Sequence, residues 1–511
     1  MLKTKLICNN FSGINRRSSV FSDNVITASD MQNVELFSTT VNSGVGIRTM
    51  MGNSAVCDLI PDDENVINIF KSVQKAQTYF LVHTENESEG KIYLFSLQNG
   101  TLTQKVSGLT LTGKSCAVDV AQGWSDLWAF SNGEDLLTIE FETYTNPDTP
   151  DTITRMHPLD SEGRTVKGLG LVVFAGRLWI FNGQILWYSV QEDIYDFSTS
   201  DAEISTSSGF IEFVKKITAI YPYLGALAVF HKDSSCMITQ EENGFSKSFD
   251  SPGGCAGYRA LVFHGTQLYF YDDTKKGIFS FLQVINGDKT LGENIALNIQ
   301  QELCEISSIN AGDIKTLSVV TSDRNEVWFL IPSEDTNYST ILIYDYLHGA
   351  WVKRKSKKIY GIEIIDGNLY SAGKKIYAEY SGWDFDGEFI EGFYNCTPLN
   401  LGVENSIKFL AYPPKITLNM YYSNDFYIEY TKDYNSLTTK TRHIVSKTLK
   451  NVLYFDKGCW DISKYPYEKI NAVKSLPSAY FKTLQMNFYA KDEGQNFCIN
   501  NIEFGKIKVK S

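Results

Sequence analysis

Short runs of alternating apolar and polar residues dominate the chain, and polar or glycine-containing turns separate them. The run RLWIFNGQILWYSV shows the unit: an apolar strand, the turn Asn182-Gly183 and a second apolar strand. Asn-Gly between two apolar runs is the strongest short signal for a β-hairpin. The pattern therefore predicts an all-β chain built mainly from antiparallel hairpins.

The hairpin unit recurs through the middle of the chain at a drifting period of roughly 40–60 residues, which is typical of four-stranded propeller blades. A single blade cannot bury its sheet faces, so neighbouring blades around a ring must cover them. We therefore expect a six- or seven-bladed β-propeller. A wide gap before the sixth unit leaves the blade number open. The units are anchored at Tyr79, Leu127, Leu178, Leu227, Leu268, Val327 and Leu369.

The two ends of the chain differ from the middle. Beyond about residue 384 the hairpin period is lost, yet long alternating strands continue, which predicts a β-sandwich-like C-terminal domain. The first 60 residues show little hydrophobic period and are expected to form an irregular arm. Short helices are expected at 27–36, where Thr27 and Asp30 fit a capping box, and at 468–474. We therefore divide the chain into an arm (1–60), a propeller (61–383) and a C-terminal β-rich domain (384–511).

Composition agrees with a folded, sheet-rich protein. The 511 residues are 43% hydrophobic and 21% charged, and they include 31 Phe, 29 Tyr and 8 Trp. A formal net charge of −12 disfavours general adhesion to DNA or anionic lipid. The nine cysteines form no CxxC pair, so we expect buried free thiols rather than a disulfide framework. No signal peptide or membrane-spanning apolar run is evident, and no membrane insertion is expected.

The stretch GLTLTGKS at 108–115 matches the Walker A pattern letter for letter. A phosphate-binding loop needs a buried strand before it and a helix after it, so that the helix N-terminus and loop amides can hold the phosphates. Here the preceding TLTQKV is polar and alternating, and the following CAVDVAQGW reaches Gly123 after a few residues. We therefore expect a loop of a β-meander and no nucleotide site.

Acidic residues gather in two patterns. Asp384 and Asp386 precede a glycine as in a calcium loop, but the glutamate that such a loop requires is missing, so a solvated turn at a domain boundary is expected. Asp272 and Asp273 are adjacent, so on a strand their side chains face opposite ways and suit shared acid–base chemistry poorly.

The sequence shows no recognisable pattern for a catalytic nucleophile or for a metal site. The six histidines are dispersed, and His83, His231 and His264 end apolar strands, where a structural imidazole is expected. No G-x-S-x-G motif, sialidase box or WD repeat is present. The sequence therefore predicts no catalytic, cofactor-binding or metal site, and we do not expect an enzyme.

Basic residues cluster late in the chain, in KRKSKK at 353–358 and in the tail KIKVK at 506–510. One interpretation is contact with DNA or with an acidic neighbouring subunit. The other, which we favour, is a solvated strand edge protected by lysines.

The opening FSGINRRSSVFSDNVITASDMQNVELF…VGIRTMMGN resembles the N-terminal arm of the tail nozzle and packaged-DNA-stabilisation proteins of short-tailed bacteriophages. The blades around Tyr188-Ser189 and around Trp351 resemble that family as well, so the resemblance spans roughly 11–355. The matching arm positions are Phe11, Gly13, Asn15, Arg16, Asn33, Val34, Arg48 and Gly52.

The resemblance implies a virion protein of the phage tail, assembled in the host cytoplasm. It implies a closed homo-oligomeric ring, usually a hexamer, below the portal and adaptor proteins. The arm and C-terminal domain would form a platform that docks on the adaptor and lines the channel. The ring would hold back packaged DNA and guide its ejection without sequence-specific contact, in the company of tail fibre or plug proteins and with no cofactor.

Two other functions stay open at this point. Exposed Trp and Tyr at blade tips would also suit a carbohydrate- or receptor-binding propeller of a phage tail or surface adhesin. An enzymatic reading would rest on 108–115 as an NTPase loop, or on a glycosidase site in the propeller. Ring formation with the adaptor, set against glycan or nucleotide binding, discriminates among the three.

Overall fold

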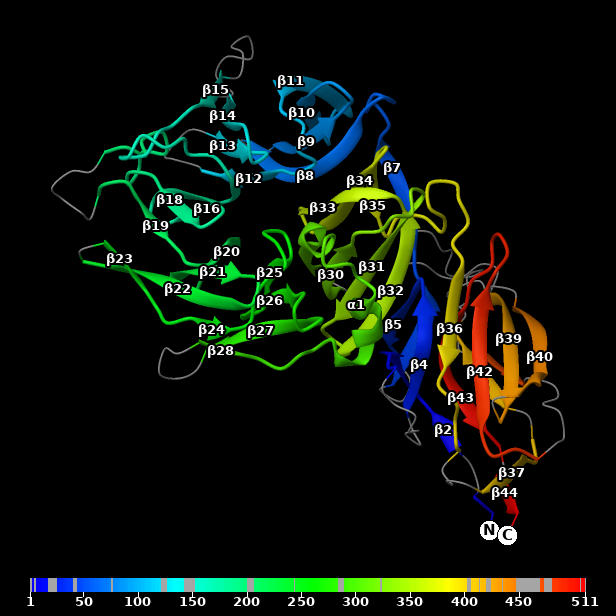
Figure 1. The fold of residues 1–511 in the computed structure, drawn as a ribbon. Helices are drawn as coiled ribbons and strands as arrows, with labels where there is room; N and C mark the ends of the chain where they lie inside the picture. The colour runs from blue at the N-terminus through cyan, green and yellow to red at the C-terminus, as the bar shows by residue number, and fades with distance from the viewer. Residues whose placement is uncertain are drawn as a thin grey trace, which may run out of the picture.

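The computed structural model is almost entirely β-structure (Figure 1). Its helices are α1 (Gln300–Cys304) and the 3-10 turns η1 (Leu297–Ile299) and η2 (Ala311–Asp313), within the described residues. In that part of the chain, no helix has the length and apolarity to span a membrane. The structure describes residues 2–510 except 4–5, 17–24, 40–43, 75–76, 121–125, 142–151, 200–205, 243, 284–288, 322–323, 402–405, 413, 420–423, 434, 447–468, 473–479 and 506.

Seven antiparallel meanders follow one another around a ring and form a seven-bladed β-propeller (Figure 1). Blades 1 to 3 are β8 (Asn65–Gln74), β9 (Gln77–Glu85), β10 (Gly90–Ser96) and β11 (Thr101–Leu109); β12 (Cys116–Asp119), β13 (Asp126–Ser131), β14 (Leu136–Phe141) and β15 (Thr152–Met156); and β16 (Leu169–Phe174), β17 (Arg177–Asn182), β18 (Ile185–Tyr188) and β19 (Gly209–Glu212). Blades 4 to 6 are β20 (Ile217–Tyr223), β21 (Ala226–His231), β22 (Ser234–Glu241) and β23 (Gly244–Lys247), with β24 (Ser251–Pro252) added; β25 (Leu261–His264), β26 (Gln267–Asp272), β27 (Gly277–Gln283) and β28 (Lys289–Leu291); and β29 (Lys315–Val320), β30 (Asn325–Ile331), β31 (Tyr338–Asp345) and β32 (Ala350–Lys357).

A strand from the N-terminal segment completes blade 7. Its first three strands are β33 (Ile359–Ile365), β34 (Asn368–Gly373) and β35 (Ile376–Glu379), and its fourth is β7 (Asn53–Cys57). β7 pairs antiparallel with β35 and places Cys57 opposite Ile376. On its other side, β33 contacts β8 of blade 1. The ring is therefore closed by residues that lie more than three hundred positions apart in sequence.

The repeat pattern identified every blade correctly. Each of the seven sequence anchors lies in the second strand of its blade, namely β9, β13, β17, β21, β26, β30 and β34. The wide gap between the fifth and sixth anchors is filled by η1, α1 and η2. The hairpin from β33 to β34 shows how turn chemistry sets register: Asp366 and Gly367 both have positive φ, 50° and 77°, as a type I′ turn requires.

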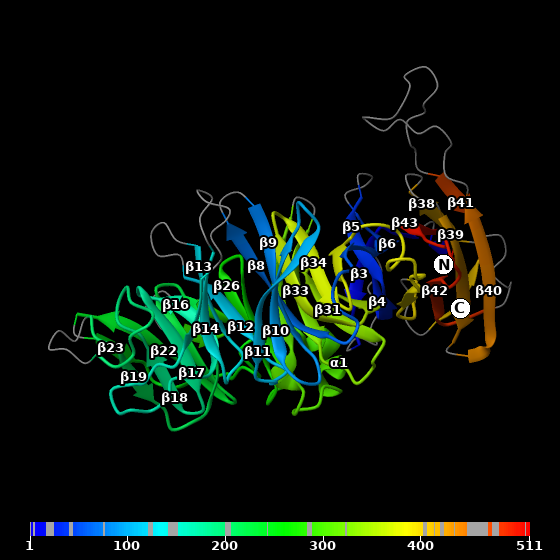
Figure 2. The same cartoon turned by 90° about the horizontal axis from the view of Figure 1, so that it is seen from above.

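The remaining strands form a second domain from both ends of the chain (Figures 1 and 2). One 12-stranded sheet runs β40-β39-β42-β36-β4-β3-β6-β43-β38-β41, with β2 and β5 paired to β43 and β6. A small sheet, β1-β44-β37, lies near the two termini (Figure 1). The bounds are β1 (Leu2–Lys3), β2 (Leu6–Cys8), β3 (Asn10–Ile14), β4 (Val25–Gln32), β5 (Val34–Ser38), β6 (Val45–Thr49), β36 (Gly392–Cys396), β37 (Ile407–Leu410), β38 (Lys415–Leu418), β39 (Asn424–Lys432), β40 (Asn435–Ser446), β41 (Lys469–Ala472), β42 (Leu484–Ala490), β43 (Cys498–Phe504) and β44 (Ile507–Lys510).

The second domain is sandwich-like because its long sheet curls over a shared core. Phe426 of β39 lies 6.4 Å from Phe488 and 5.6 Å from Phe497, ring centre to ring centre. Phe497 directly precedes β43, which is distant from β39 in the sheet order. A backbone bridge between Asp425 and Asn496 and the contact between Phe426 and Phe497 therefore bring the start of β43 beside β39.

The N-terminal segment is more regular than we expected. Residues 27–36, predicted as a helix, form β4 and β5 instead, and alternate positions such as Ile26 and Ala28 are fully buried. Pairing with β36 and β3 outweighs the local capping signal. The second predicted helix, 468–474, contains the strand β41, and its other residues lie outside the described part. A boundary at residue 60 also places β7 outside the propeller that it completes.

Ser54→Pro should open the propeller at its closing strand. Asn53 and Ala55 direct their N–H groups to Asp384 and Asp386, so the N–H of Ser54 faces β35 by alternation. Proline removes that donor, and we expect a loss of about 1–3 kcal/mol of stability. Hydrogen exchange should rise selectively in blade 7. Ser54→Ala is the control, because it alters only the exposed side chain and should leave exchange in blade 7 almost unchanged. Equal exchange in blade 7 of both variants would contradict the role of β7 in closing the ring.

Candidate functional site

The most elaborate constellation in the structure is the joint between the propeller and the second domain. β32, the last strand of blade 6, contacts β3, β4 and β5 (Figure 1). Gly13 lies directly against Trp351: a Cβ at Gly13 would stand 2.1 Å from the Trp351 carbonyl oxygen. Trp351 is buried, and its indole N–H donates to the Ile295 carbonyl at 2.8 Å. Only glycine permits this close approach of the two backbones.

Asn33 ties three segments together at the joint. Its backbone N–H donates to the Lys353 carbonyl at 2.8 Å, and its Oδ1 accepts from the Lys355 N–H at 2.8 Å. Its Nδ2 donates to the Glu391 carbonyl at 3.0 Å. The residue has a φ of 51°, a conformation that asparagine adopts more readily than most residues. One side chain therefore satisfies backbone groups of both domains.

The basic cluster at 353–358 belongs to this joint. Lys353 Nζ lies 2.7 Å from Asp30 of β4, and Lys357 Nζ lies 3.3 Å from Glu388. Arg354 and Ser356 are fully buried. The favoured interpretation, a solvated strand edge, is therefore wrong for this cluster: its side chains bind groups of the same chain.

Arg354 forms an ion pair that water does not reach. Its Nη2 lies 2.5 Å from Glu379 Oε2, and both side chains are 0% exposed. Its Nη1 also donates to the Met51 carbonyl at 2.8 Å. The rings of Tyr380 and Phe385 lie 5.3 and 5.0 Å from the guanidinium. The pair thus joins blade 6, blade 7 and the N-terminal segment.

A second buried group of charges lies nearby. Glu35 of β5 is held between Arg48 at 2.5 Å and Arg324 at 2.8 Å. Arg324 also pairs with Glu326 at 3.1 Å, and the Tyr380 hydroxyl donates to Glu326 at 2.9 Å. Burial raises the pKa of Glu326, and the neighbouring Arg324 opposes that rise. The carboxylates and guanidiniums alternate, so each charge in the group has an opposite neighbour.

Sequence analysis did not single out Glu35, Arg324, Glu326 or Glu379. Isolated charged residues flank many apolar runs in this chain, and nothing in their spacing marks these four. The arm residues that carry the family resemblance, by contrast, lie in or beside the joint. Besides Gly13, Asn33 and Arg48, these are Phe11, whose ring meets Tyr394 at 5.7 Å, Arg16, which pairs with Glu302 at 2.9 Å, and Gly52, where a Cβ would stand 1.6 Å from the Asp384 carbonyl oxygen.

The Walker-like stretch 108–115 is a loop between two strands, as expected. It leaves β11 at Leu109 and enters β12 at Cys116 with no helix. Four backbone amides of this loop, which a phosphate-binding loop would direct at phosphates, donate instead to carboxylates of this chain. The Gly108 N–H donates to Glu89 at 2.6 Å, Thr110 to Asp135 at 2.6 Å, and Thr112 and Gly113 to Glu85 at 2.9 and 3.0 Å.

The other sequence candidates are structural. Asp384 and Asp386 form a turn in which Asp384 accepts the Gly387 N–H at 3.0 Å and Asp386 pairs with Lys375 at 3.0 Å. Within the described residues, no group of three or more His, Cys, Asp or Glu is placed to hold a metal ion. Of the described cysteines, all except Cys304 are buried.

The strand-end histidines have structural partners or surroundings. His231 Nδ1 lies 3.0 Å from the Lys216 carbonyl, and His264 Nδ1 lies 2.7 Å from Ser318 Oγ. His83 is fully buried, and neither of its ring nitrogens has a hydrogen-bond partner. Burial, helped by the charge of Lys315, lowers the pKa of His83 to about 3. His83 is therefore a neutral packing residue at physiological pH.

The sheet topology defines the class: a seven-bladed β-propeller joined to a β-sandwich-like domain made from both chain ends. No family model and no curated protein match the chain. Among solved structures it is similar to a candidate 6-phosphogluconolactonase from Bacteroides uniformis, with TM-score 0.36 and 11% identity over 61% of this chain and 89% of that one. The Neurospora crassa Pan2 WD40 domain gives TM-score 0.34 and 8% identity over 65% of this chain and 94% of that one. Similarities at this level carry no argument about activity or partners.

Arg354→Met should strongly destabilise the protein, because it leaves Glu379 charged and buried without its partner. We expect a loss of about 3–5 kcal/mol, measured as a lower thermal midpoint. The double variant Arg354→Met/Glu379→Gln should recover a substantial part of the loss. A single variant as stable as the parent would show that the pair does not hold the joint.

His83 should make the fold sensitive to mild acid. Unfolded His83 binds a proton near its ordinary pKa of 6.5, whereas the folded side chain stays neutral down to about 3. The unfolded state therefore binds more protons in this window, and stability falls as pH falls, by up to ~1.4 kcal/mol per pH unit. His83→Leu should show a shallower decline of the thermal midpoint between pH 6.5 and 4. The exposed His157→Leu should follow the parent; identical slopes for all three proteins would refute the assignment.

Proposed function

We propose that this protein is a structural subunit of the tail nozzle of a short-tailed bacteriophage and forms a closed ring below the portal and adaptor. One observation carries the proposal: several arm residues that resemble the nozzle family lie where the arm meets the propeller. Gly13 permits the contact with Trp351, Asn33 bridges the two domains, and Arg48 binds the buried Glu35. These positions have a mechanical role that a nozzle subunit requires.

The force that such a subunit must bear gives a reason for the buried charges at the joint. A ring that retains packaged DNA must resist force without letting its propeller tilt against its platform. Ion pairs that are buried and hydrogen-bonded fix geometry, since any displacement leaves a charge unpaired in a poorly hydrated place. In this proposal the chain performs no reaction, and its work depends on rigidity and complementary surfaces.

Ring closure needs two different surfaces on each subunit, because head-to-tail contacts join unlike patches. The 12-stranded sheet supports such contacts: among the strands that the structure describes, its path ends at β40 on one side and at β41 on the other. An end strand offers unpaired backbone groups to another chain. The net charge of −12 also suits a channel that DNA must pass without adhering.

The proposal is tested by electron microscopy of the purified protein mixed with its adaptor. We expect closed rings, with glycan binding absent on an array. Lys353→Glu should reduce ring formation, and the charge swap Asp30→Lys/Lys353→Glu should restore part of it, because the Lys353–Asp30 pair is re-formed in reverse while Arg16, which lies 3.4 Å from Asp30, then faces a lysine. Lys247→Glu, in an exposed pair with Asp250 of blade 4, serves as the control. A protein that stays monomeric with the adaptor and binds glycans would instead be a carbohydrate-binding propeller.

A further inference from the structure

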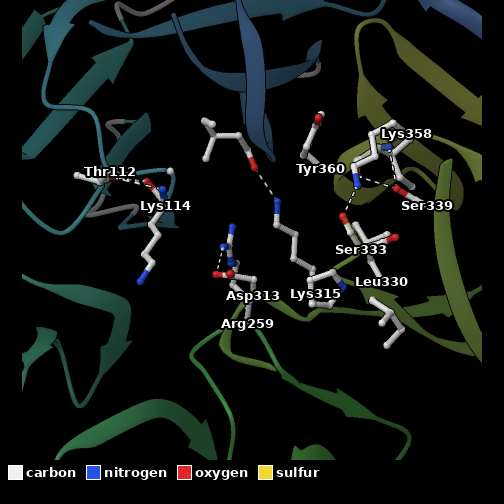
Figure 3. A pocket seen from close by; sticks show the side chains of 15 residues that line it. Thr112, Lys114, Arg259, Asp313, Lys315, Leu330, Ser333, Ser339, Lys358 and Tyr360 are labelled. Carbon is white, nitrogen blue, oxygen red and sulfur yellow. Dashed lines mark hydrogen bonds and ion pairs between the residues drawn. The ribbon is translucent and has the colours of Figure 1, made fainter. Parts of the chain in front are cut away.

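A cavity near the propeller axis is lined by basic side chains from different parts of the ring. It encloses about 370 Å³ between blades 1, 6 and 7 and the segment that connects blade 4 to blade 5. Figure 3 shows four cations around it: Lys114, Arg259, Lys315 and Lys358. Asp313 is the one acidic residue of the lining. The pocket therefore has a formal excess of positive charge.

Arg259 is the central group, and its hydrogen-bonding capacity is not met by the protein. Its Nε and Nη1 atoms are buried and have no hydrogen-bond partner, while Nη2 stands 4.0 Å from Asp313. A guanidinium normally uses its planar array of donors to bind an anion. Unsatisfied donors of this kind are costly in a buried position, so they mark a place where an acceptor belongs.

The surrounding backbone holds Arg259 in place. The Thr316 N–H donates to the Arg259 carbonyl at 2.9 Å, and its hydroxyl lies 2.9 Å from that carbonyl and 2.6 Å from the Leu261 carbonyl. Gly257 lies so close to Gly312 that a Cβ would stand 2.4 Å from the Gly312 carbonyl oxygen. The adjacent Tyr258 reaches across to donate to the Ser115 carbonyl at 3.0 Å. The backbone that carries Arg259 is thus fixed in position before any ligand arrives, which limits where its guanidinium can lie.

Lys315 and Lys114 add unmatched charge. Lys315 is 9% exposed, and its ammonium has one acceptor in the described chain, the Ile67 carbonyl at 2.6 Å, although an ammonium has three donors. Burial and the neighbouring Arg259 lower the pKa of Lys315 well below its usual range. An anion bound beside Lys315 would favour the charged ammonium form. Lys114 is exposed, and its ammonium has no acceptor among the described residues (Figure 3).

The remaining groups near the pocket are already occupied. Lys358 donates to the carbonyls of Ser333 and Asp335 at 2.8 and 2.7 Å. The carboxylate of Glu85 accepts the amides of Thr112 and Gly113. The imbalance therefore centres on Arg259, Lys315 and Lys114.

We propose that this axial pocket binds a small molecule that carries a phosphate group. A phosphate monoester bears up to two negative charges and three acceptor oxygens, which suit one guanidinium and two ammoniums better than a single carboxylate does. The cavity volume and the apolar wall formed by Ile67, Leu330, Ile331 and Tyr360 leave room for an attached organic part. This site is independent of the proposed nozzle function, and neither depends on the other.

Isothermal titration calorimetry of the full chain tests the site with ribose 5-phosphate, inorganic phosphate, ribose and a short oligothymidylate. Ribose 5-phosphate should bind, inorganic phosphate should compete with it, and ribose should not bind. Arg259→Met and Lys315→Met should each weaken the binding at least about tenfold, as loss of a charge-assisted contact implies. Lys215→Met, which alters an exposed lysine of blade 4 paired with Asp233, should bind like the parent.

Lys114→Met provides a second variant should the buried substitutions prevent folding, because its side chain is exposed. It should weaken ribose 5-phosphate severalfold with an unchanged thermal midpoint. The proposal fails if the folded parent binds neither ribose 5-phosphate nor inorganic phosphate at millimolar concentration, or if Arg259→Met and Lys114→Met both bind normally. Binding of oligothymidylate alone would also overturn it, because the site would then serve nucleic acid.

Discussion

The structure depends on one pairing, that of β7 with β35, because it commits the N-terminal segment to two partners at once. β7 completes blade 7, and the strands just before it, β3 to β6, lie within the sheet of the second domain. The propeller is therefore an insertion between the two halves of another domain. The closing strand cannot leave the ring without pulling on the sheet to which it is connected. Mechanical coupling between the domains follows from this connectivity.

Buried charge then fixes the angle between the two domains. Apolar side chains alone would also bury surface at the joint, but they would let the two domains slide past each other at little cost in free energy. Glu35 of β5 and Arg324 of blade 6 pair across the two domains and tolerate little displacement, because an unpaired charge in that environment is strongly unfavourable. Arg354 and Glu379 hold blades 6 and 7 together in the same way beside the joint. Desolvation of these groups offsets much of their mutual attraction, so their main contribution is to orientation.

Near the propeller axis, in contrast to the joint, a buried cation has donors without hydrogen-bond acceptors. In the loop at 108–115, the backbone amides are matched by Glu85, Glu89 and Asp135. A short distance away, Arg259 keeps two buried donors without acceptors. The amides of the loop at 108–115 thus have carboxylate acceptors, whereas two donors of Arg259 have none among the described residues. Arg259 has two such donors beside a cavity, which gives the site its weight.

Sequence alone determined the propeller, because strands with a period of two and Asn-Gly or Asp-Gly turns are local signals that every blade repeats. The hairpin at Asp366-Gly367 needed no tertiary information. The tertiary structure alone decided the role of the ends: β4 was expected as a helix, and its pairing with β36, more than three hundred residues away, made it a strand. The joint between the two domains could not be predicted from the sequence for the same reason. Whether Glu35 or Arg354 lies in water or in a buried pair depends on which distant strand covers it, and a linear pattern carries no record of that contact.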